Sequence, residues 1–381
     1  MKDKKISICF VTINGSPDFL GGYSLYHKNL IEYIKSKNIN LNVSWVYFGK
    51  ENRIYDKEGV HYFELKSNRI NSFMQIGRHI LLAKFFKKNY FDIINCIGGI
   101  WTLFYKKRKN QKIIQTFHGT VYYFNKNQMN RFNILKRIFL SPILPLSWIL
   151  ERPHKETDKI ICVSEKVKRQ VENLYGKRKN IYVIRTGVNL KYFKPRDKEK
   201  TKKQLNLNTK NFYGLYVGGG GYWGKGLDRA IKLSEEIYNK YKNYQLIIIG
   251  ADYNKSKRLL NNKRSLIFLK NVPRERMPLY YSASDMFFCL SRYEGGAPTL
   301  VTSEAMASGC LLICSRDAEQ EVIENDKNGL ILEKFDKDNV NKIIKILKDK
   351  KRKEEIIKNS IKTIKEFSLE KWGEKSINIL K

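Results

Sequence analysis

The segment YYSASDMFFCLSRYEGGAPTLVTSEAMASGCLLICS, residues 280–315, gives the clearest indication of the fold. An apolar run, DMFFCL, leads into a polar turn that carries Glu294 and then into a Gly-Gly-Ala-Pro loop. A helix is expected to begin near Thr299, with Glu304 in its opening turns, and LLICS has the composition of a buried strand. A strand, a loop, a helix and a second strand in this order predict a parallel β–α–β unit.

The same alternation of short β-branched runs and amphipathic helical patterns continues along the whole chain. Before residue 190 the strand-like runs are KISICFVT, LNVSWVYF, FDIINC, KIIQTF, KIICVS and NIYVIR, and after it they are YGLYVG, YQLIIIG, SLIFLK, DMFFCL, LLICS and GLILE. A length of 381 residues exceeds what one hydrophobic core usually organises. We therefore predict an α/β protein with two Rossmann-like, doubly wound domains that face each other across a cleft.

Composition shifts indicate where the domains end. The stretch KYFKPRDKEKTKKQ combines a proline with a dense charge run, as linkers often do, so residues 191–203 are expected to be a linker. It would separate a first domain, residues 1–190, from a second one, residues 204–365. The stretch FSLEKWGEKSINIL has apolar residues at helical spacing, and residues 366–381 are expected to form a helix that packs back on the first domain.

Charge and cysteine content restrict the class of protein. The chain has 73 Lys and Arg against 37 Asp and Glu, a formal net charge of +36. Such a charge suits a polyanionic partner, but it also results from a lysine-rich composition without function. Nucleic acid is not an expected partner, because no arginine-rich block, RNA-binding aromatic signature or zinc-finger spacing is present. The six cysteines form no C-x-x-C pair, and the first residues lack the form of a signal peptide, so a cytoplasmic enzyme is expected.

The segment around Glu294 and Glu304 has the features of an anion site. The N–H groups at the start of a helix, together with loop amides, attract a diphosphate, so Thr299, Leu300 and Val301 are expected to bind one. An ionised Glu304 could accept two hydrogen bonds from a ribose, and Glu294 could meet hydroxyls of a sugar. The alternative is that Glu304 only favours the helix start and that Glu294 is a solvated turn residue.

A second glycine-rich turn lies in YGLYVGGGGYWGKGLDRAI, residues 213–231. Gly218 and Gly219 would let the backbone approach phosphates closely, and Lys225 would balance their charge. The spacing also nearly fits a P-loop. Gly226, however, replaces the Ser or Thr that would bind Mg²⁺, so an NTPase is not indicated.

Taken together, these segments closely resemble glycosyltransferase family 4. The runs SRYEGG and SEAMASG match the donor-site signature of that family, and DKIICVSE, VIRTGVNLKYF and DAEQEVIENDKNG follow in the expected order over nearly the whole chain. The resemblance implies the GT-B fold and a retaining transfer of a sugar from a nucleoside diphosphate. Two departures stand out. Nine residues separate Glu294 from Glu304 where the family usually has seven, and Gly219 replaces an arginine.

The resemblance also implies roles for residues elsewhere in the chain. His118, directly after the strand KIIQTF, resembles the histidine of a His-Gly dipeptide that orients the donor sugar. Gly21 and Gly22 resemble the family's glycine loop between acceptor and diphosphate. Val272 and Asp252 resemble strand-end positions around the nucleotide base. Local interpretations without function, a structural histidine and tight turns, remain open for these residues.

The function expected from these features is that of a retaining, hexosyltransferase-type enzyme. It would move a sugar from a nucleotide-sugar donor to an acceptor hydroxyl on a glycan, a lipid-linked molecule or a small molecule, in cell-surface glycan or glycolipid synthesis. No metal or other cofactor is expected, because Lys225 and the helix start would stabilise the leaving diphosphate. The alternatives are a nucleotide-sugar epimerase or a sugar phosphorylase of the same architecture, and a non-catalytic basic protein that binds nucleic acid or membrane.

The stretch RFNILKRIFLSPILPLSWILER, residues 131–152, has two interpretations. Aromatic and aliphatic residues are interleaved with Lys136, Arg137 and Arg152, which favours peripheral contact with a membrane. In the cell, this contact would be with the inner face of the membrane. A helix that lines the core of the first domain explains the same apolar residues and is the preferred interpretation. The charges and the two prolines of this stretch exclude a membrane-spanning helix.

Overall fold

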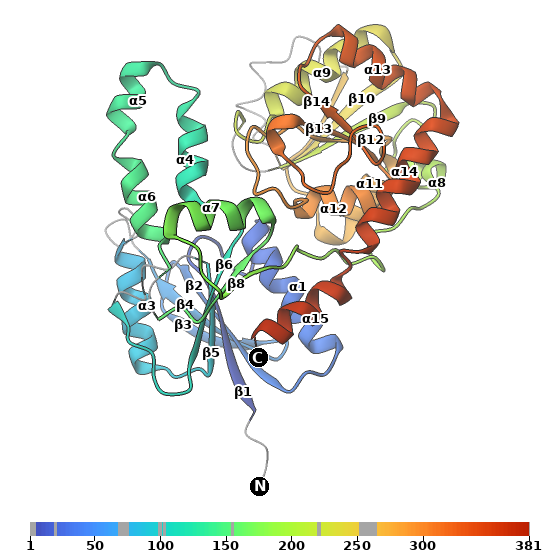
Figure 1. Cartoon of the computed structure of the whole chain (residues 1–381). Coiled ribbons are helices and arrows are strands. Elements are labelled where there is room, and N and C mark those ends of the chain that lie inside the picture. Colours follow the sequence, from blue (N-terminus) through green and yellow to red (C-terminus); the bar gives the residue numbers. More distant parts are fainter. Residues whose placement is uncertain are drawn as a thin grey trace. The chain divides into compact units, whose positions relative to one another are not determined.

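The computed structural model describes residues 5–18, 21–67, 76–97, 101, 104–153, 156–218, 222–250 and 265–380 (Figure 1). The chain divides into two compact units. Unit 1 comprises Met1–Arg185 and Trp372–Lys381, and unit 2 comprises Thr186–Lys371. Each unit contains a largely or wholly parallel sheet flanked by helices, so the predicted α/β class with two Rossmann-like domains is confirmed.

Unit 1 contains an eight-stranded sheet in the order β3-β4-β2-β1-β5-β6-β7-β8, in which only the β3–β4 pair is antiparallel. The strands are β1 (Ile6–Thr12), β2 (Leu41–Gly49), β3 (Arg53–Lys57), β4 (Val60–Lys66), β5 (Ile93–Cys96), β6 (Lys112–Phe117), β7 (Lys159–Cys162) and β8 (Ile181–Val183). The described helices of this unit include α1 (Gly22–Ser36), α3 (Ile76–Lys88), α4 (Val121–Met129), α5 (Ile134–Leu140), α6 (Ile143–Glu151) and α7 (Glu165–Tyr175).

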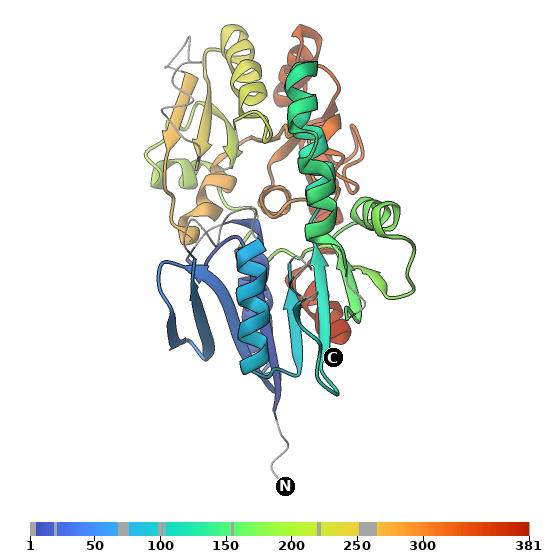
Figure 2. The same cartoon turned by 90° about the vertical axis from the view of Figure 1, so that its left-hand side faces the viewer.

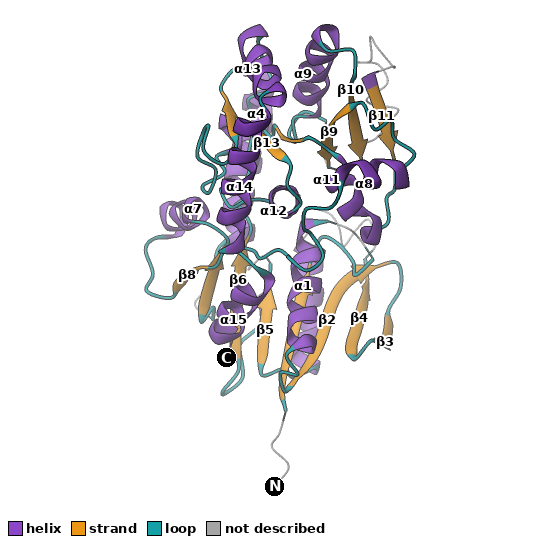
Figure 3. Ribbon diagram, turned by 90° about the vertical axis from the view of Figure 1, so that its right-hand side faces the viewer, coloured by secondary structure: helices purple, strands orange, loops and turns teal. Residues whose placement is uncertain are grey.

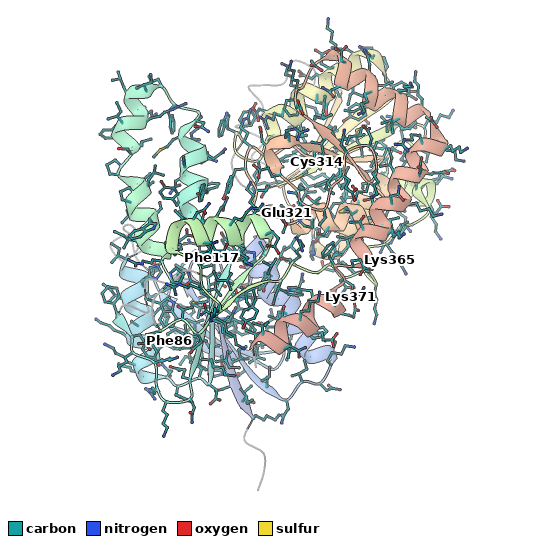
Figure 4. All side chains as sticks on the ribbon, viewed as in Figure 1. Phe86, Phe117, Cys314, Glu321, Lys365 and Lys371 are labelled. Carbon is teal, nitrogen blue, oxygen red and sulfur yellow. The ribbon has the colours of Figure 1, made fainter. Side chains whose placement is uncertain are left out.

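The central strands of unit 1 are apolar on both faces, as parallel strands between two helical layers must be. Ile8, Cys9 and Phe10 of β1 are fully buried. Phe86 of α3 and Phe117 at the end of β6 also lie in the interior of this unit (Figure 4). The apolar runs of the sequence therefore form the core.

Unit 2 contains a six-stranded, wholly parallel sheet in the order β11-β10-β9-β12-β13-β14 (Figure 3). The strands are β9 (Phe212–Val217), β10 (Tyr244–Ile249), β11 (Leu266–Leu269), β12 (Met286–Cys289), β13 (Leu311–Ser315) and β14 (Leu330–Leu332). The described α-helices of this unit include α8 (Lys198–Gln204), α9 (Leu227–Lys240), α11 (Met277–Ala283), α12 (Leu300–Ala307), α13 (Lys337–Lys348) and α14 (Lys350–Lys365). Cys314 lies in the interior of this unit (Figure 4), and all six cysteines are free and buried.

The expectation of a linker at residues 191–203 is wrong, because this stretch is part of unit 2. Phe193 is 2% exposed within the core of unit 2. Lys198 and Lys202 reach the buried carboxylate of Asp285 at 3.0 and 3.6 Å. Burial opposes the charged form of Asp285, but the two lysines outweigh it and hold the pKa of this carboxyl below its usual value. The charge run therefore neutralises a buried acid.

The C-terminal helix α15 (Leu369–Leu380) joins unit 1 from Trp372 onward. The ring of Trp372 packs edge-on against Tyr26 of α1, with 5.0 Å between centroids. The Nζ atom of Lys159 donates a hydrogen bond of 2.6 Å to the carbonyl of Ile379. The chain thus returns to unit 1 at residue 372, six residues later than the sequence suggested.

Helices α4, α5 and α6 form a hairpin that projects from the sheet of unit 1 (Figure 1). The preferred expectation, that residues 131–152 line the core of this unit, is wrong for α5, which has no buried residue. The apolar side chains of α5 lie at the surface: Ile134, Leu135, Ile138 and Phe139 are all exposed. None of the helices in the described ranges combines the length and the apolar character needed to cross a bilayer.

Candidate functional site

The switch point of the unit 2 sheet brings together the two segments that the sequence singled out. From β9 the chain builds the sheet outward through β10 and β11, and it then returns to β12 on the other side of β9. Ligands of open parallel sheets bind beyond the strand ends at such a reversal. The turn after β9, which includes Lys225, and the turn after β12, which includes Glu294, lie at this place.

The two turns are held against each other by Arg292. Its N–H donates to the carbonyl of Gly224 at 2.9 Å, and its guanidinium binds both carboxylate oxygens of Asp228 at 2.8 and 2.6 Å. Gly226 is in the left-handed region, with a φ of +71°, and a Cβ on it would lie 1.9 Å from the carbonyl oxygen of Leu290. Only glycine fits this close approach, which explains why the P-loop Ser or Thr is absent.

Lys225 and Glu294 form an ion pair at the centre of these turns. The Nζ atom of Lys225 lies 2.8 and 3.0 Å from the two carboxylate oxygens, and the hydroxyl of Ser291 donates to Oε1 of Glu294 at 2.6 Å. Burial opposes the charge of Lys225, but Glu294 outweighs it and raises the pKa of this lysine. The side chain of Lys225 is 43% exposed and that of Glu294 only 10%. The sequence predicts that both residues bind the donor, but it does not predict that they pair with each other.

Glu304 lies in α12 with both carboxylate oxygens already in use. Its Oε1 accepts a hydrogen bond from the guanidinium of Arg274, and its Oε2 accepts one of 2.9 Å from the hydroxyl of Tyr281. The residue is 1% exposed. Burial alone would lower the pKa of Arg274, but the charge of Glu304 raises it. Protein groups thus occupy both oxygens in this structure, and the binding of a ribose by Glu304 stays a prediction.

The start of α12 is placed as the sequence predicted. Thr299 is the N-cap: its Oγ1 accepts from the N–H of Thr302 at 3.3 Å, while its own N–H donates to Oε1 of Gln320 at 3.3 Å. Leu300 and Val301 are partly exposed. The N–H groups of these two residues are beyond the reach of the helix's own carbonyls, and they remain suited to an anion.

The other predicted donor residues of unit 2 border the same sheet edge. Gly218 follows β9 directly, and its N–H donates to the carbonyl of Ile249 at 3.0 Å. Val272 is 9% exposed and its side chain packs in the core, so only its backbone is left for a ligand. Gly219 and Asp252 lie outside the described residues.

The remaining candidates belong to unit 1. Gly21 caps α1 without a side-chain hydrogen bond, and a Cβ on Gly22 would meet nothing within 4 Å. His118 packs edge-on against the rings of Tyr23 and Tyr26, at 5.0 and 4.6 Å between centroids. Burial lowers the pKa of His118 to about 4, so its imidazole is neutral at neutral pH. The structure thus gathers the donor candidates in unit 2, and the acceptor-loop glycines and the histidine in unit 1.

Comparison with known proteins identifies the family. Residues 20–192 match the model of Glycosyltransferase Family 4, and residues 197–363 match that of Glycosyl transferases group 1. The chain is a family 4-like glycosyltransferase. This glycosyltransferase is 24% identical over 315 residues to spore coat protein SA of Bacillus subtilis (strain 168), an alignment that covers 75% of each chain.

Solved structures share the fold of the glycosyltransferase over nearly its whole length. Sucrose-phosphate synthase from Thermosynechococcus elongatus has a TM-score of 0.77 at 18% identity and covers 98% of both chains. WaaG, a glycosyltransferase involved in lipopolysaccharide biosynthesis, has a TM-score of 0.77 at 14% identity, and the match covers 98% of this chain and 99% of WaaG. Anabaena Alr3699/HepE in complex with UDP-glucose has a TM-score of 0.69 at 16% identity, and the match covers 98% of this chain and 99% of the Anabaena protein. The predicted GT-B fold is confirmed.

Three residues of the candidate site were missed by sequence reasoning. Arg274 and Tyr281 hold Glu304, and Arg292 joins the two turns. Arg292 stands two residues before Glu294, but an arginine in a turn resembles the many other basic residues of this chain. Among the residues that the structure describes, no cluster of three or more His, Cys, Asp or Glu side chains is placed to hold a metal ion.

Proposed function

We propose that this glycosyltransferase moves a sugar from a nucleoside diphosphate to an acceptor hydroxyl with retention of configuration, and that the donor binds at the switch point of unit 2. The observation that carries the proposal is the Lys225–Glu294 pair together with the partly exposed start of α12, which follows the Glu294 turn in the chain. A likeness of fold to proteins solved with UDP-glucose, such as Anabaena Alr3699/HepE, supports a nucleotide-sugar donor. Hexosyl transfer in glycan or glycolipid synthesis is part of the same proposal.

Lys225 keeps the capacity to bind a phosphate although it is paired. A lysine ammonium has three N–H donors, and the two oxygens of Glu294 take two of them. The third donor is left for a phosphate oxygen, and the 43% exposure of the side chain gives a ligand access to it. Glu294 thereby fixes the ammonium in one position, where it stabilises charge on the leaving group without further reorganisation.

The reaction breaks the bond between the anomeric carbon and the diphosphate oxygen. The acceptor oxygen bonds to the same carbon on the same face, and the acceptor's proton passes to an oxygen of the departing diphosphate. The N–H groups of Leu300 and Val301 and the ammonium of Lys225 stabilise the charge of this diphosphate. The chemistry proposed here uses no metal, and the acceptor is a glycan, a lipid-linked molecule or a small molecule.

The experiment begins with a panel of UDP-, GDP- and ADP-sugars and measures thermal stabilisation, donor hydrolysis and transfer. A donor at one hundred times its Kd stabilises a protein by about 2.7 kcal/mol, which in a unit of this size is roughly 5–10 °C. Lys225→Ala should lower turnover by about 10²–10³-fold, as the removal of a preorganised hydrogen-bond donor does. Glu294→Gln should lower turnover by a smaller factor. The matched control is Lys232→Ala, which removes an exposed lysine of α9, the helix that follows the turn of Lys225, and its turnover should be unaffected.

Two results would contradict the proposal. If no nucleotide sugar stabilises the protein, the switch point is not a donor site. If Lys225→Ala retains turnover within a few fold, or if a chelator abolishes the activity of the unmodified protein, the diphosphate is stabilised by other means.

A further inference from the structure

The end of the helical hairpin of unit 1 exposes an unusual amount of apolar surface. We call residues 131–143 the hairpin tip; it contains α5 and the turns on either side of it (Figure 2). Ile134, Leu135, Ile138 and Phe139 are 74%, 78%, 65% and 82% exposed. Isolated exposed apolar residues are common, but four neighbouring ones at such exposure mark a contact surface.

The charges around these side chains all have one sign. The sequence contains no Asp or Glu between Asp92 and Glu151, whereas the hairpin tip carries Arg131, Lys136 and Arg137. Arg131 and Lys136 lie over the ring of Phe132, at 4.4 and 4.5 Å from its centroid. The cations thus border the apolar surface, an arrangement that is complementary to a surface with an apolar interior and anionic groups at its edge.

The hairpin is anchored well enough to present this surface. The side-chain amide of Asn125 on α4 donates to the hydroxyl of Ser147 on α6 at 2.7 Å. At its base, the indole N–H of Trp148 donates to the carbonyl of Leu174 at 2.8 Å, and Glu151 accepts from the N–H of Val121 at 2.6 Å. Near the tip, Arg137 donates to the backbone carbonyls of Met129, Asn130 and Phe132. Arg137 is therefore structural.

We propose that the hairpin tip inserts into the surface of an anionic lipid membrane. Ile134, Leu135, Ile138 and Phe139 would enter the boundary between headgroups and acyl chains, while Arg131 and Lys136 meet the headgroup phosphates. A second copy of the chain fits this surface less well, because two basic tips repel each other. The proposal does not depend on the transfer reaction, since it concerns binding alone.

The test is flotation of the purified chain with vesicles of phosphatidylcholine alone and of phosphatidylcholine with 30% phosphatidylglycerol. The protein should float with the anionic vesicles, and less of it should float as salt increases. Each basic side chain near an anionic surface contributes about fivefold to binding, so Arg131→Glu with Lys136→Glu should weaken it by at least roughly 25-fold. Leu135→Ser with Phe139→Ser should weaken it by at least about tenfold.

Matched controls separate the hairpin tip from general effects of charge and exposure. Ile54→Ser alters an apolar residue of β3 that is also 65% exposed, and Lys57→Glu reverses an exposed charge on the same strand. Both variants should float like the unmodified chain. Retained far-UV circular dichroism and unchanged melting temperatures show that the tip variants remain folded, which the exposure of the altered side chains leads us to expect.

A direct readout comes from Phe139→Cys labelled with an environment-sensitive fluorophore, because the six native cysteines are buried. Its emission should shift to the blue with anionic vesicles. The proposal is overturned if no anionic vesicle carries the chain, or if the tip and control variants float equally. It is also overturned if sedimentation velocity shows a dimer that Leu135→Ser with Phe139→Ser dissociates, since a second copy would then cover the tip.

Discussion

Replacement of Glu304 by Gln tests whether this carboxylate belongs to the protein or to the donor. In the structure its two oxygens accept hydrogen bonds from Arg274 and Tyr281, and no ligand is needed to satisfy them. Gln has nearly the same volume, so the substitution leaves no cavity. It removes the charge that compensates Arg274. The variant should therefore be less stable even without any donor.

The expected loss follows from the burial of the pair. The side chain of Glu304 is 2% exposed and that of Arg274 is 25% exposed. Removal of one partner from a buried pair costs about 3–5 kcal/mol, and the partial exposure of Arg274 favours the lower limit. For a unit of this size, a loss of about 3 kcal/mol lowers the melting temperature by roughly 6–12 °C.

The assay is thermal and urea unfolding of Glu304→Gln, with Glu355→Gln as the matched control. Glu355 also pairs with an arginine, Arg352, but this pair lies on the surface, and its loss should cost less than about 1 kcal/mol. Our reasoning is refuted if Glu304→Gln melts within about 2 °C of the unmodified chain while its Kd for the donor rises tenfold or more. Glu304 would then serve the ribose, as the family resemblance implied.

Two further predictions concern the framework around the site. Gly226→Ala should destabilise unit 2 by about 1–3 kcal/mol in urea unfolding, because the new Cβ meets the carbonyl of Leu290; unchanged stability would show that the turns are not locked together. Unit 1 should be acid-sensitive, because burial lowers the pKa of His27 and His79 to about 3 and of His118 to about 4. Below pH 6.5 the unfolded chain binds protons that the folded unit does not, so stability falls as pH drops toward 4, by up to about 2 kcal/mol for each histidine at pH 5. The melting temperature should therefore be lower at pH 5 than at pH 7.5, and the decrease should be smaller in His79→Leu.

Much of the fold could be predicted from the sequence because each buried parallel strand corresponds to a short, continuous apolar run. Runs such as KISICFVT and DMFFCL are apolar on both faces, and they appear as β1 and β12. The charge run at 191–203 was misinterpreted because lysines usually lie in solvent. Nothing local in the sequence indicates that Lys198 and Lys202 pair with Asp285, which is more than eighty residues away.

The candidate site could be predicted as a set of positions but not as a set of contacts. A glycine-rich turn after one strand and a helix start after another are local features, and sheet order brings them together. The partners of the charged residues are not local: Lys225 meets Glu294, and Glu304 meets Arg274. An ionisable side chain that is buried must find a partner, but the sequence does not say which one.

The pairing of charges at the switch point determines how it can attract a diphosphate. Lys225, Arg229, Arg292 and Arg274 are matched by Glu294, Asp317, Asp228 and Glu304 respectively. These side chains are therefore close to neutral as a group, although the whole chain carries a formal charge of +36. Among the residues that the structure describes there, the groups that remain suited to two phosphates are the N–H groups at the start of α12 and the third N–H of the Lys225 ammonium. Such N–H groups act at hydrogen-bond distance and select a ligand by its geometry. Surface cations without an acidic partner, such as Arg131 and Lys136 of the hairpin tip, act over a Debye length and select only by charge. The excess of lysine in this protein thus explains little about the proposed donor site.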